Sequence, residues 1–209
     1  MKILLASKEK FLIKEGYRHL GIAKDKLRIG RVITAIKGSE DENFAAYMEE
    51  YKQGMIKEGI YFEEIDIKGK TAEEIYTFFG DKNVIQVEGG SPFYLLKYAR
   101  EVGFDMIVKD LLDKGLVYVG CSSGSHLMSP SFVLATMKKG RNRYGITDFS
   151  AYGYVSYLVR PHYVNSMDDG LREIIKQTGN RIRLITDEQA ILIEDGQETF
   201  IGGPELILQ

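Results

Sequence analysis

Short apolar runs alternate with helical patterns between residues 3 and 119, and this alternation limits the fold more than any other feature of the chain. Residues 3–6 (ILLA) form a continuous apolar run, and residues 28–36 (RIGRVITAI) form a second, β-branched one. Strands that are apolar throughout are typical of a sheet buried on both faces. Because parallel strands need helical crossovers, the alternation predicts an α/β fold with a doubly wound, mostly parallel sheet and helices on both faces.

Periodicity and capping signals predict the other elements of this half. Ser39 and Glu42 form a capping-box pattern for a long amphipathic helix that ends at Gly59. Its apolar positions recur at helical spacing and are Phe44, Tyr47, Met48, Tyr51, Met55 and Ile56. We expect further strands at 60–67, 83–87 and 116–119, and further helices at 71–79, 92–101 and 104–113.

The second half is less regular. It shows strand-like stretches at 157–159, 181–185, 189–193 and 199–201 and a helical one at 168–178. The last two strands flank a Glu-Asp-Gly turn, so the sheet should end in a hairpin. The chain has no Pro/Gly/Ser-rich linker, internal repeat or charge block, and we therefore expect a single domain spanning residues 1–209.

Charge and cysteine content exclude several classes of protein. Lys and Arg total 28 against 30 Asp and Glu, so no overall charge favours nucleic acid or an anionic membrane as partner. The single cysteine, Cys121, cannot form an intrachain disulfide or build a cysteine-rich zinc site, which indicates a reducing compartment. No apolar run is long enough for a signal or membrane segment, so we expect a cytoplasmic protein. The oligomeric state stays open, with a homodimer among the options.

Residues 120–124 (GCSSG) match the nucleophile elbow G-x-S-x-G directly after a predicted strand. Ser122 is then the nucleophile, and the N–H of Ser123, at the start of the following helix, would stabilise an oxyanion. A plain turn or a phosphate cradle is the alternative, although the chain lacks the P-loop and dinucleotide-binding motifs. Cys121 would point along the strand, and we interpret it as a packed thiol.

A serine nucleophile needs a base, and the chain offers three histidines. His126 lies four residues past Ser122 on the same short helix, where packing or substrate contact is the better interpretation. His19 lies in a segment expected at the surface. His162 closes the strand-like stretch at 157–159 and is the predicted base, with a structural histidine as the alternative.

A second glycine-rich loop follows the predicted strand at 83–87. Gly89, Gly90 and Ser91 precede a helix that begins with Pro92. Backbone N–H groups of a Gly-Gly pair can approach a ligand closely, so this loop is a candidate second oxyanion donor and substrate contact.

Together these segments resemble the dipeptidase E family of serine peptidases. The similar segments, in the family's order, are 87–96 (VEGGSPFYLL), 120–125 (GCSSGS), 161–163 (PHY), 186–191 (TDEQAI) and 202–204 (GGP). The resemblance implies a fold like that of class I glutamine amidotransferases. It also implies hydrolysis of short peptides, the family's founding substrates being dipeptides with an amino-terminal aspartate.

The resemblance further implies roles for individual residues. Ser122 is the nucleophile, His162 the general base, and Gly90 with the N–H of Ser123 the oxyanion hole, with no metal or organic cofactor. Two positions depart from the family: Ser123 stands where Ala is usual, and Ser91 where Asn is usual. Both replacements are small.

The third member of the triad is less clear. The acid that the family offers about fifteen residues past the nucleophile has no counterpart here, so the resemblance leaves Asp187 or Glu188 as the carboxylate that orients the imidazole. Recognition of an aspartyl side chain calls for a cation. Arg160, Arg141 and Arg143 are near the relevant loops, and of these Arg160 is the candidate for substrate binding.

Two other functions remain open on the sequence alone. The same constellation would serve a serine esterase or amidase that acts on a non-peptide substrate. A catalytically silent binding protein with this fold is the third option, suggested by the missing acid and by Ser91.

Overall fold

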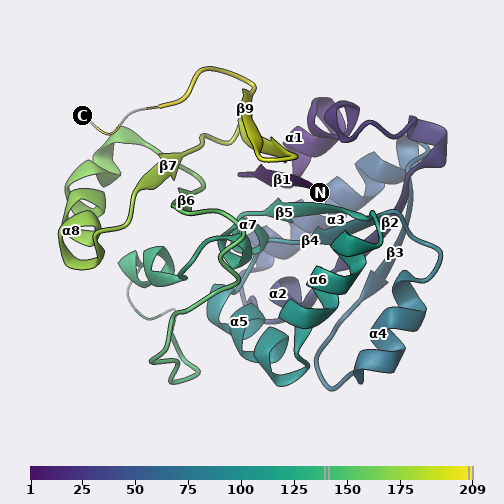
Figure 1. The fold of residues 1–209 in the computed structure, drawn as a ribbon, viewed down its shortest axis with the longest axis horizontal. Helices are drawn as coiled ribbons and strands as arrows, with labels where there is room; N and C mark the ends of the chain where they lie inside the picture. Colours follow the sequence, from purple (N-terminus) through teal and green to yellow (C-terminus); the bar gives the residue numbers. More distant parts are fainter. Residues whose placement is uncertain (139, 141, 207, 209) are drawn as a thin grey trace.

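The apolar runs of the first half form parallel strands of one sheet in the computed structural model, which describes residues 1–209 except 139, 141, 207 and 209. In order across the sheet, the strands are β3 (Tyr61–Ile65), β2 (Arg28–Val32), β4 (Val84–Val87), β5 (Val117–Cys121), β1 (Lys2–Ala6), β8 (Ala190–Glu194) and β9 (Gln197–Ile201). The strands from β3 to β1 in this order run parallel, whereas β8 is antiparallel to β1 and β9 to β8. The predicted mostly parallel sheet and C-terminal hairpin are confirmed (Figure 1).

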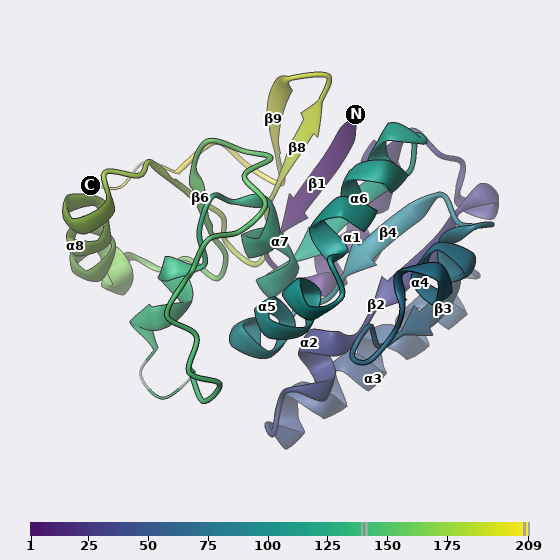
Figure 2. The same cartoon turned by 60° about the horizontal axis from the view of Figure 1, so that its bottom comes forward.

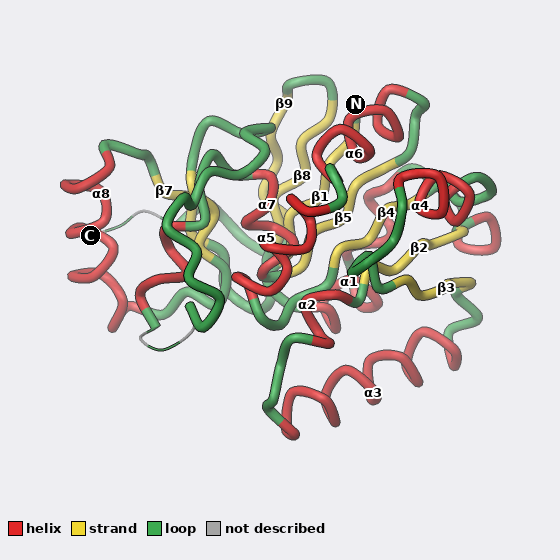
Figure 3. Tube along the Cα trace, turned by 90° about the horizontal axis from the view of Figure 1, so that it is seen from below, coloured by secondary structure: helices red, strands yellow, loops and turns green. Residues whose placement is uncertain are grey.

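Helices cover both faces of this sheet. The covering helices are α1 (Glu9–Lys14), α2 (Thr34–Lys37), α3 (Glu42–Lys57), α4 (Ala72–Phe79), α5 (Pro92–Glu101), α6 (Phe104–Asp113) and α7 (Ser123–Met128), whereas α8 (Asp168–Thr178) lies beside the sheet. Short 3-10 turns are η1 (Gly16–Leu20), η2 (Lys24–Lys26), η3 (Val133–Met137) and η4 (Asn165–Met167). Figure 3 shows α3 and α4 on opposite faces of the strands.

Two apolar layers follow from the alternation of side chains along each strand. In β1, Leu4 and Ala6 pack with α1 and α3, while Ile3 and Leu5 pack with the layer of α4, α5, α6 and α7. All four side chains are fully buried. Successive strand residues point to opposite faces, so a strand that is apolar at every position feeds both layers.

The structure corrects the predicted start of α3 and one of its buried positions. Asp41, rather than Ser39, caps the helix, because its side chain accepts the N–H groups of Asn43 and Phe44. Ile56, predicted on the apolar face, is 54% exposed.

The second predicted strand is also shorter than expected. β2 ends at Val32, where its pairing with both β3 and β4 ends, and the β-branched run continues into the helical turn α2. There Thr34 donates a hydrogen bond to Asp66 and accepts one from the N–H of Ile67. Tertiary partners therefore override the local strand preference.

Two of the predicted strands of the second half lie outside the main sheet. β6 (Leu158–Arg160) and β7 (Ile182–Leu184) pair in parallel with each other. They pack with α8 around a small apolar cluster that includes Leu158, Leu171 and Leu184. Figure 1 shows this group at the left, beside the main sheet.

The carboxyl ends of the parallel strands meet at one edge of the sheet. Ser7 follows β1, the loop of residues 88–91 follows β4, and Ser122 follows β5. Figure 2 shows β1 between this parallel set and the C-terminal hairpin. Within the described residues, no helix combines the length and the apolar character needed to cross a bilayer.

Candidate active site

Ser122 occupies a strained turn between β5 and α7. Its backbone has a φ of 49° and a ψ of −105°, a conformation that residues with a side chain adopt rarely. A Cβ on Gly120 would lie 2.7 Å from the backbone of Gly124, and one on Gly124 would lie 2.1 Å from the carbonyl oxygen of Val87. Strand, helix and neighbouring strand meet so closely that these two positions require glycine.

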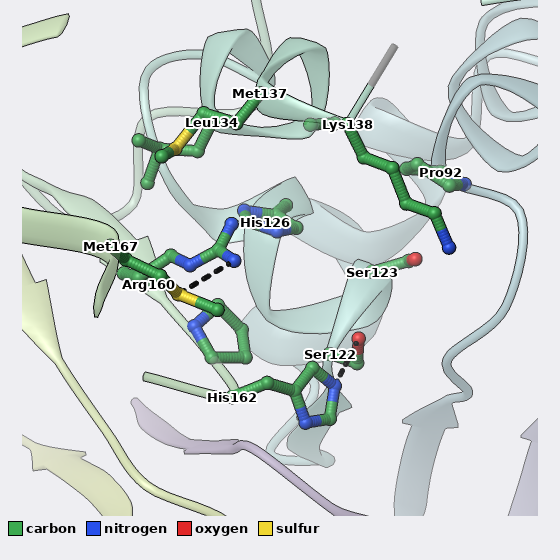
Figure 4. Close-up of a pocket in the computed structure, with 12 residues that line it drawn as sticks. Pro92, Ser122, Ser123, His126, Leu134, Met137, Lys138, Arg160, His162 and Met167 are labelled. Carbon is green, nitrogen blue, oxygen red and sulfur yellow. Dashed lines mark hydrogen bonds between the residues drawn. The ribbon is translucent and has the colours of Figure 1, made fainter. Parts of the chain in front are cut away.

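The imidazole of His162 lies between Ser122 and Asp187. Its Nε2 is 3.0 Å from the Oγ of Ser122, and its Nδ1 is 2.5 Å from the Oδ1 of Asp187. Figure 4 shows the first of these contacts at the mouth of a cavity. An ionised carboxylate can only accept, so Nδ1 carries the proton and Nε2 is left to accept the serine hydroxyl.

The carboxylate of Asp187 is well supplied with donors. Besides the contact with His162, it accepts a hydrogen bond from Ser7 at 3.0 Å and one from the Nζ of Lys8 at 3.2 Å. The hydrogen bond from His162 is the main cause that holds the pKa of Asp187 well below its usual range, and the Lys8 and Ser7 contacts lower it further. The low pKa favours the ionised form of Asp187 near neutral pH.

Glu188, the alternative acid, lies elsewhere. Its carboxylate pairs with the Nζ of Lys14 on α1 at 2.5 Å, and both side chains are exposed. The two adjacent acids therefore project to different sides of their turn. Of these two acids, Asp187 is the one hydrogen-bonded to His162 among the described contacts.

Sequence reasoning missed Ser7 and Lys8. The backbone N–H of His162 donates to the Oγ of Ser7 at 2.8 Å, so Ser7 holds both the base and the acid. His162 has a φ of 56°, and this contact helps to fix that uncommon conformation. The signal was present: Ser7 directly follows a strand whose carboxyl end reaches the same edge as Ser122.

The loop after β4 faces Ser122 from the next strand. Gly90 has a φ of 131°, and a Cβ there would lie 2.3 Å from the carbonyl oxygen of Ala35. Its carbonyl oxygen accepts the hydroxyl of Ser123 at 3.1 Å. The N–H of Ser123 starts α7 and has no intrahelical acceptor. The two predicted oxyanion donors therefore belong to backbone segments that touch each other.

The other members of this loop have different surroundings. Ser91 precedes α5 and lines a cavity together with Gly90. Gly89, predicted to contact substrate, lines neither cavity at Ser122, and its N–H is directed into the protein, where it donates to Glu9. A side chain from α1 therefore already occupies this donor, and contact between Gly89 and substrate stays a prediction.

The other two histidines have contacts of a different kind from those of His162. His126 is buried against the ring of Phe132 and lines the cavity, in keeping with the predicted packing or contact role. His19 is part-buried, not fully solvated, and contacts Glu15 at 3.0 Å. Cys121 is a fully buried thiol whose pKa is raised by burial, so it is poorly suited to be a nucleophile.

Two cavities open beside Ser122 and His162. The first, of about 490 Å³, is walled by Leu134, Met137 and Met167 and also contains Arg160 and Lys138. Figure 4 shows Arg160 reaching into it beside Met167, whose sulfur is 3.1 Å from the guanidinium.

The second cavity, of about 460 Å³, lies on the side of the glycine loop. Arg143 lines it and pairs with Glu40 at 2.5 Å. Arg141, the other candidate cation, lies outside the described residues.

Comparisons with known proteins agree on one family. The profile of Peptidase family S51 matches residues 35–201. An uncharacterized peptidase of Listeria monocytogenes, Lmo0363, is 27% identical over 181 residues, which cover 85% of each chain. Peptidase E of Salmonella arizonae is 30% identical over 125 residues, which cover 58% of this chain and 48% of the relative.

Solved structures share the fold. A candidate Peptidase E protein from Listeria monocytogenes EGD-e superposes with a TM-score of 0.81 at 23% identity, covering 97% of this chain and 98% of the other. A peptidase from an acI-B1 Actinobacterium gives a TM-score of 0.65 at 18% identity, with 98% and 92% covered.

Proposed function

The chain belongs to peptidase family S51 and is a peptidase, and from this premise we propose that it hydrolyses short peptides through a Ser122–His162–Asp187 triad. The observation that carries the proposal is the continuous set of contacts from Asp187 through His162 to the hydroxyl of Ser122, at 2.5 and 3.0 Å. A nucleophile within hydrogen-bond reach of a base, itself oriented by a third group, is the arrangement that acyl transfer requires.

The first half of the reaction forms an acyl-enzyme. Nε2 of His162 takes the hydroxyl proton of Ser122 as Oγ attacks the scissile carbonyl carbon. The N–H groups of Gly90 and Ser123 receive the negative charge that develops on the carbonyl oxygen. The imidazolium, stabilised by Asp187, gives its proton to the departing amine as the C–N bond breaks.

The second half releases the acid. A water molecule gives a proton to Nε2 of His162 and attacks the ester carbon, and the same N–H groups hold the oxyanion again. The ester C–O bond breaks, and the proton returns from His162 to the Oγ of Ser122. The peptide has gained one water, and the enzyme is unchanged.

We further propose that the peptide's acidic side chain, in dipeptides with an amino-terminal aspartate, occupies the first cavity. Arg160 and Lys138 line this cavity together with Ser122 and supply positive charge there, and a guanidinium pairs well with a carboxylate. The apolar wall formed by Leu134, Met137 and Met167 excludes water and strengthens that attraction.

A panel of matched dipeptides tests this function. We expect Asp-Leu to be cleaved with a kcat/KM at least about tenfold above that of Asn-Leu, which has the same shape without the charge. Arg160→Gln should remove the difference, whereas Arg143→Gln, in the second cavity, should keep it.

Ser122→Ala is the control for contaminating activity and should cleave neither dipeptide. Cleavage of esters but of no peptide in the panel would contradict a short-peptide substrate. Retained turnover in Ser122→Ala would contradict the triad itself.

A further inference from the structure

The loop that carries Gly90 is held by its own N–H groups. The N–H of Glu88 donates to the carbonyl of Val32 at 3.2 Å, and the N–H of Ser91 donates to the carbonyl of Ala35 at 2.8 Å. The N–H of Gly89 donates to the Oε1 of Glu9 at 3.0 Å. Of these four consecutive groups, only the N–H of Gly90 has no acceptor among the residues that the structure describes.

Glu9 is the one side chain among these three anchors. It begins α1 and is only 2% exposed, and its Oε2 accepts the hydroxyl of Tyr47 at 3.1 Å. A Cβ on Gly89 would lie 2.7 Å from Oε1 of Glu9 and 3.1 Å from the Cβ of Ser122. The Gly89 peptide is therefore clamped between the carboxyl group of Glu9 and the nucleophile.

Glu9 also faces a second acid. Oxygens of Glu9 and Glu88 and the sulfur of Cys121 all lie within 4.8 Å of one another. Glu88 is fully buried, its Oε1 accepts from Arg31 and Gln86, and its Oε2 has no hydrogen-bond partner in the described part of the chain. Burial first, and Glu88 second, raise the pKa of Glu9 to about 7.

This cluster is better suited to a proton than to a metal ion. Both oxygens of Glu9 already accept hydrogen bonds, and Oε1 of Glu88 is held by the Arg31 guanidinium at 2.5 Å. That leaves one carboxylate oxygen and the Cys121 thiol, too few ligands for the usual four-coordinate site. A proton on Glu9 removes its negative charge beside Glu88. Oε1 of Glu9 then still has a lone pair that accepts the N–H of Gly89.

We propose that Glu9 is a positioning residue for the reaction: its side chain holds the Gly89 peptide from inside the protein and thereby directs the next N–H, that of Gly90, at the substrate carbonyl. This inference rests on the proposed function, since it assumes that a carbonyl is attacked at Ser122. It assigns a task to a buried acid that does not touch substrate and that the triad does not use.

Two variants of equal length separate the hydrogen bond from the packing. Glu9→Gln keeps an oxygen for the Gly89 N–H, and its kcat should stay within about threefold of wild type. Glu9→Met fills similar space but offers no carboxyl oxygen, and its kcat should fall about 10- to 100-fold with KM changed less than about threefold, since a misplaced oxyanion donor acts on the transition state. Tyr47→Phe removes the other contact of Glu9 and should leave kcat within about threefold.

A second measurement does not depend on activity. In the ¹⁵N-labelled full chain, the Gly89 amide resonance should move with pH around a midpoint near 7 in wild type and stay fixed in Glu9→Gln. The groups that face Glu9 are Glu88, Cys121 and Tyr47, with Arg31 behind Glu88. Glu88→Gln should therefore shift the midpoint downward, because it removes a negative charge that raises the pKa of Glu9.

The outcomes are distinct. Wild-type kcat in a folded Glu9→Met, a Glu9→Gln as impaired as Glu9→Met, or a Gly89 amide that ignores pH would overturn the positioning role. If Glu9→Met does not fold, the activity of Glu9→Gln and the titration of the Gly89 amide test the positioning role of Glu9. A wild-type protein that cleaves no peptide while Gly89 titrates as expected would defeat the proposed function and would show the clamp to be structural.

Discussion

Two acids at the same edge of the sheet behave in opposite ways. Asp187 is 42% exposed and meets His162, Lys8 and Ser7, and the hydrogen bond from His162 above all lowers its pKa. Glu9 is 2% exposed and faces Glu88, and burial raises its pKa to about 7. The residue type is nearly the same, but solvent access and the charge of the nearest partner differ.

This contrast suggests a division of labour around Ser122. An ionised carboxylate stabilises the imidazolium that forms when His162 takes a proton. A carboxyl group whose pKa is raised to about 7 is protonated below that pH, and it can then accept an N–H in a closed space without adding a second negative charge next to Glu88. In our proposal, the accessible acid assists proton transfer and the buried one holds a backbone loop.

The largest effect should come from removing the charge of the accessible acid. Asp187→Asn keeps the shape but favours the wrong tautomer of His162, and kcat/KM should fall about 10⁴-fold. Steady-state hydrolysis of Asp-Leu measures this change. Glu188→Gln, one residue away and paired with Lys14, is the matched control. A loss of less than about tenfold in Asp187→Asn would remove Asp187 from the triad.

The buried acid should control stability rather than rate as pH changes. The folded-state pKa of Glu9 is raised from 4.5 to about 7, so the native state binds more protons than the unfolded chain between these values. The contribution of Glu9 to stability, about 3 kcal/mol, is therefore fully present below pH 4.5, declines as pH rises from 4.5 to 7 and is lost above 7.

Glu9→Gln does not titrate and should escape this decline. Urea unfolding of wild type and variant at pH 5 and pH 8 measures the difference, which should favour Glu9→Gln increasingly toward pH 8. If the difference in unfolding free energy between wild type and Glu9→Gln is the same at both pH values, the raised pKa of Glu9 is contradicted.

Ser7 joins the backbone of His162 to Asp187, and losing its hydroxyl should have a smaller effect. Ser7→Ala leaves the direct contact between His162 and Asp187 in place, so we expect kcat/KM to fall about tenfold. Ser7→Thr, which keeps the hydroxyl, should recover part of the loss. Equal activity of Ser7→Ala and wild type would mean that the direct contact alone orients the ring.

The smallest effect is expected at Glu188. Its ion pair with Lys14 is exposed, and such pairs contribute little to stability. Glu188→Gln should leave kcat/KM within about twofold and the free energy of unfolding within about 0.5 kcal/mol. Thermal unfolding together with the dipeptide assay checks both. A larger loss of activity would show that Glu188 assists the site.

The sheet could be predicted from the sequence because its signals are local. Residues 3–6 are apolar at every position, and Thr71 with Glu74 forms the capping box that the structure contains. Ser122 could be singled out because the G-x-S-x-G pattern around it is itself local, although the structure shows that Gly124 is required by its close approach to Val87 on β4.

The remaining parts of the site depend on contacts between distant segments. The hydrogen bond from Ser7 to Asp187 joins residues 180 positions apart, and that from Gly89 to Glu9 joins residues 80 positions apart. Hydrophobic periodicity describes residues within one helix or strand, so it does not predict contacts between residues so far apart in the sequence. The choice between Asp187 and Glu188 likewise depends on which way each side chain leaves a turn.

The central claim is that Ser122 is a nucleophile activated by His162, and covalent labelling tests it most directly. The full chain is treated with a fluorophosphonate, digested and mapped by mass spectrometry, in parallel with His162→Ala. The account predicts one adduct, on Ser122, that forms at least about 100-fold more slowly in the variant. An adduct on another residue, or no adduct on folded wild-type protein, would contradict it.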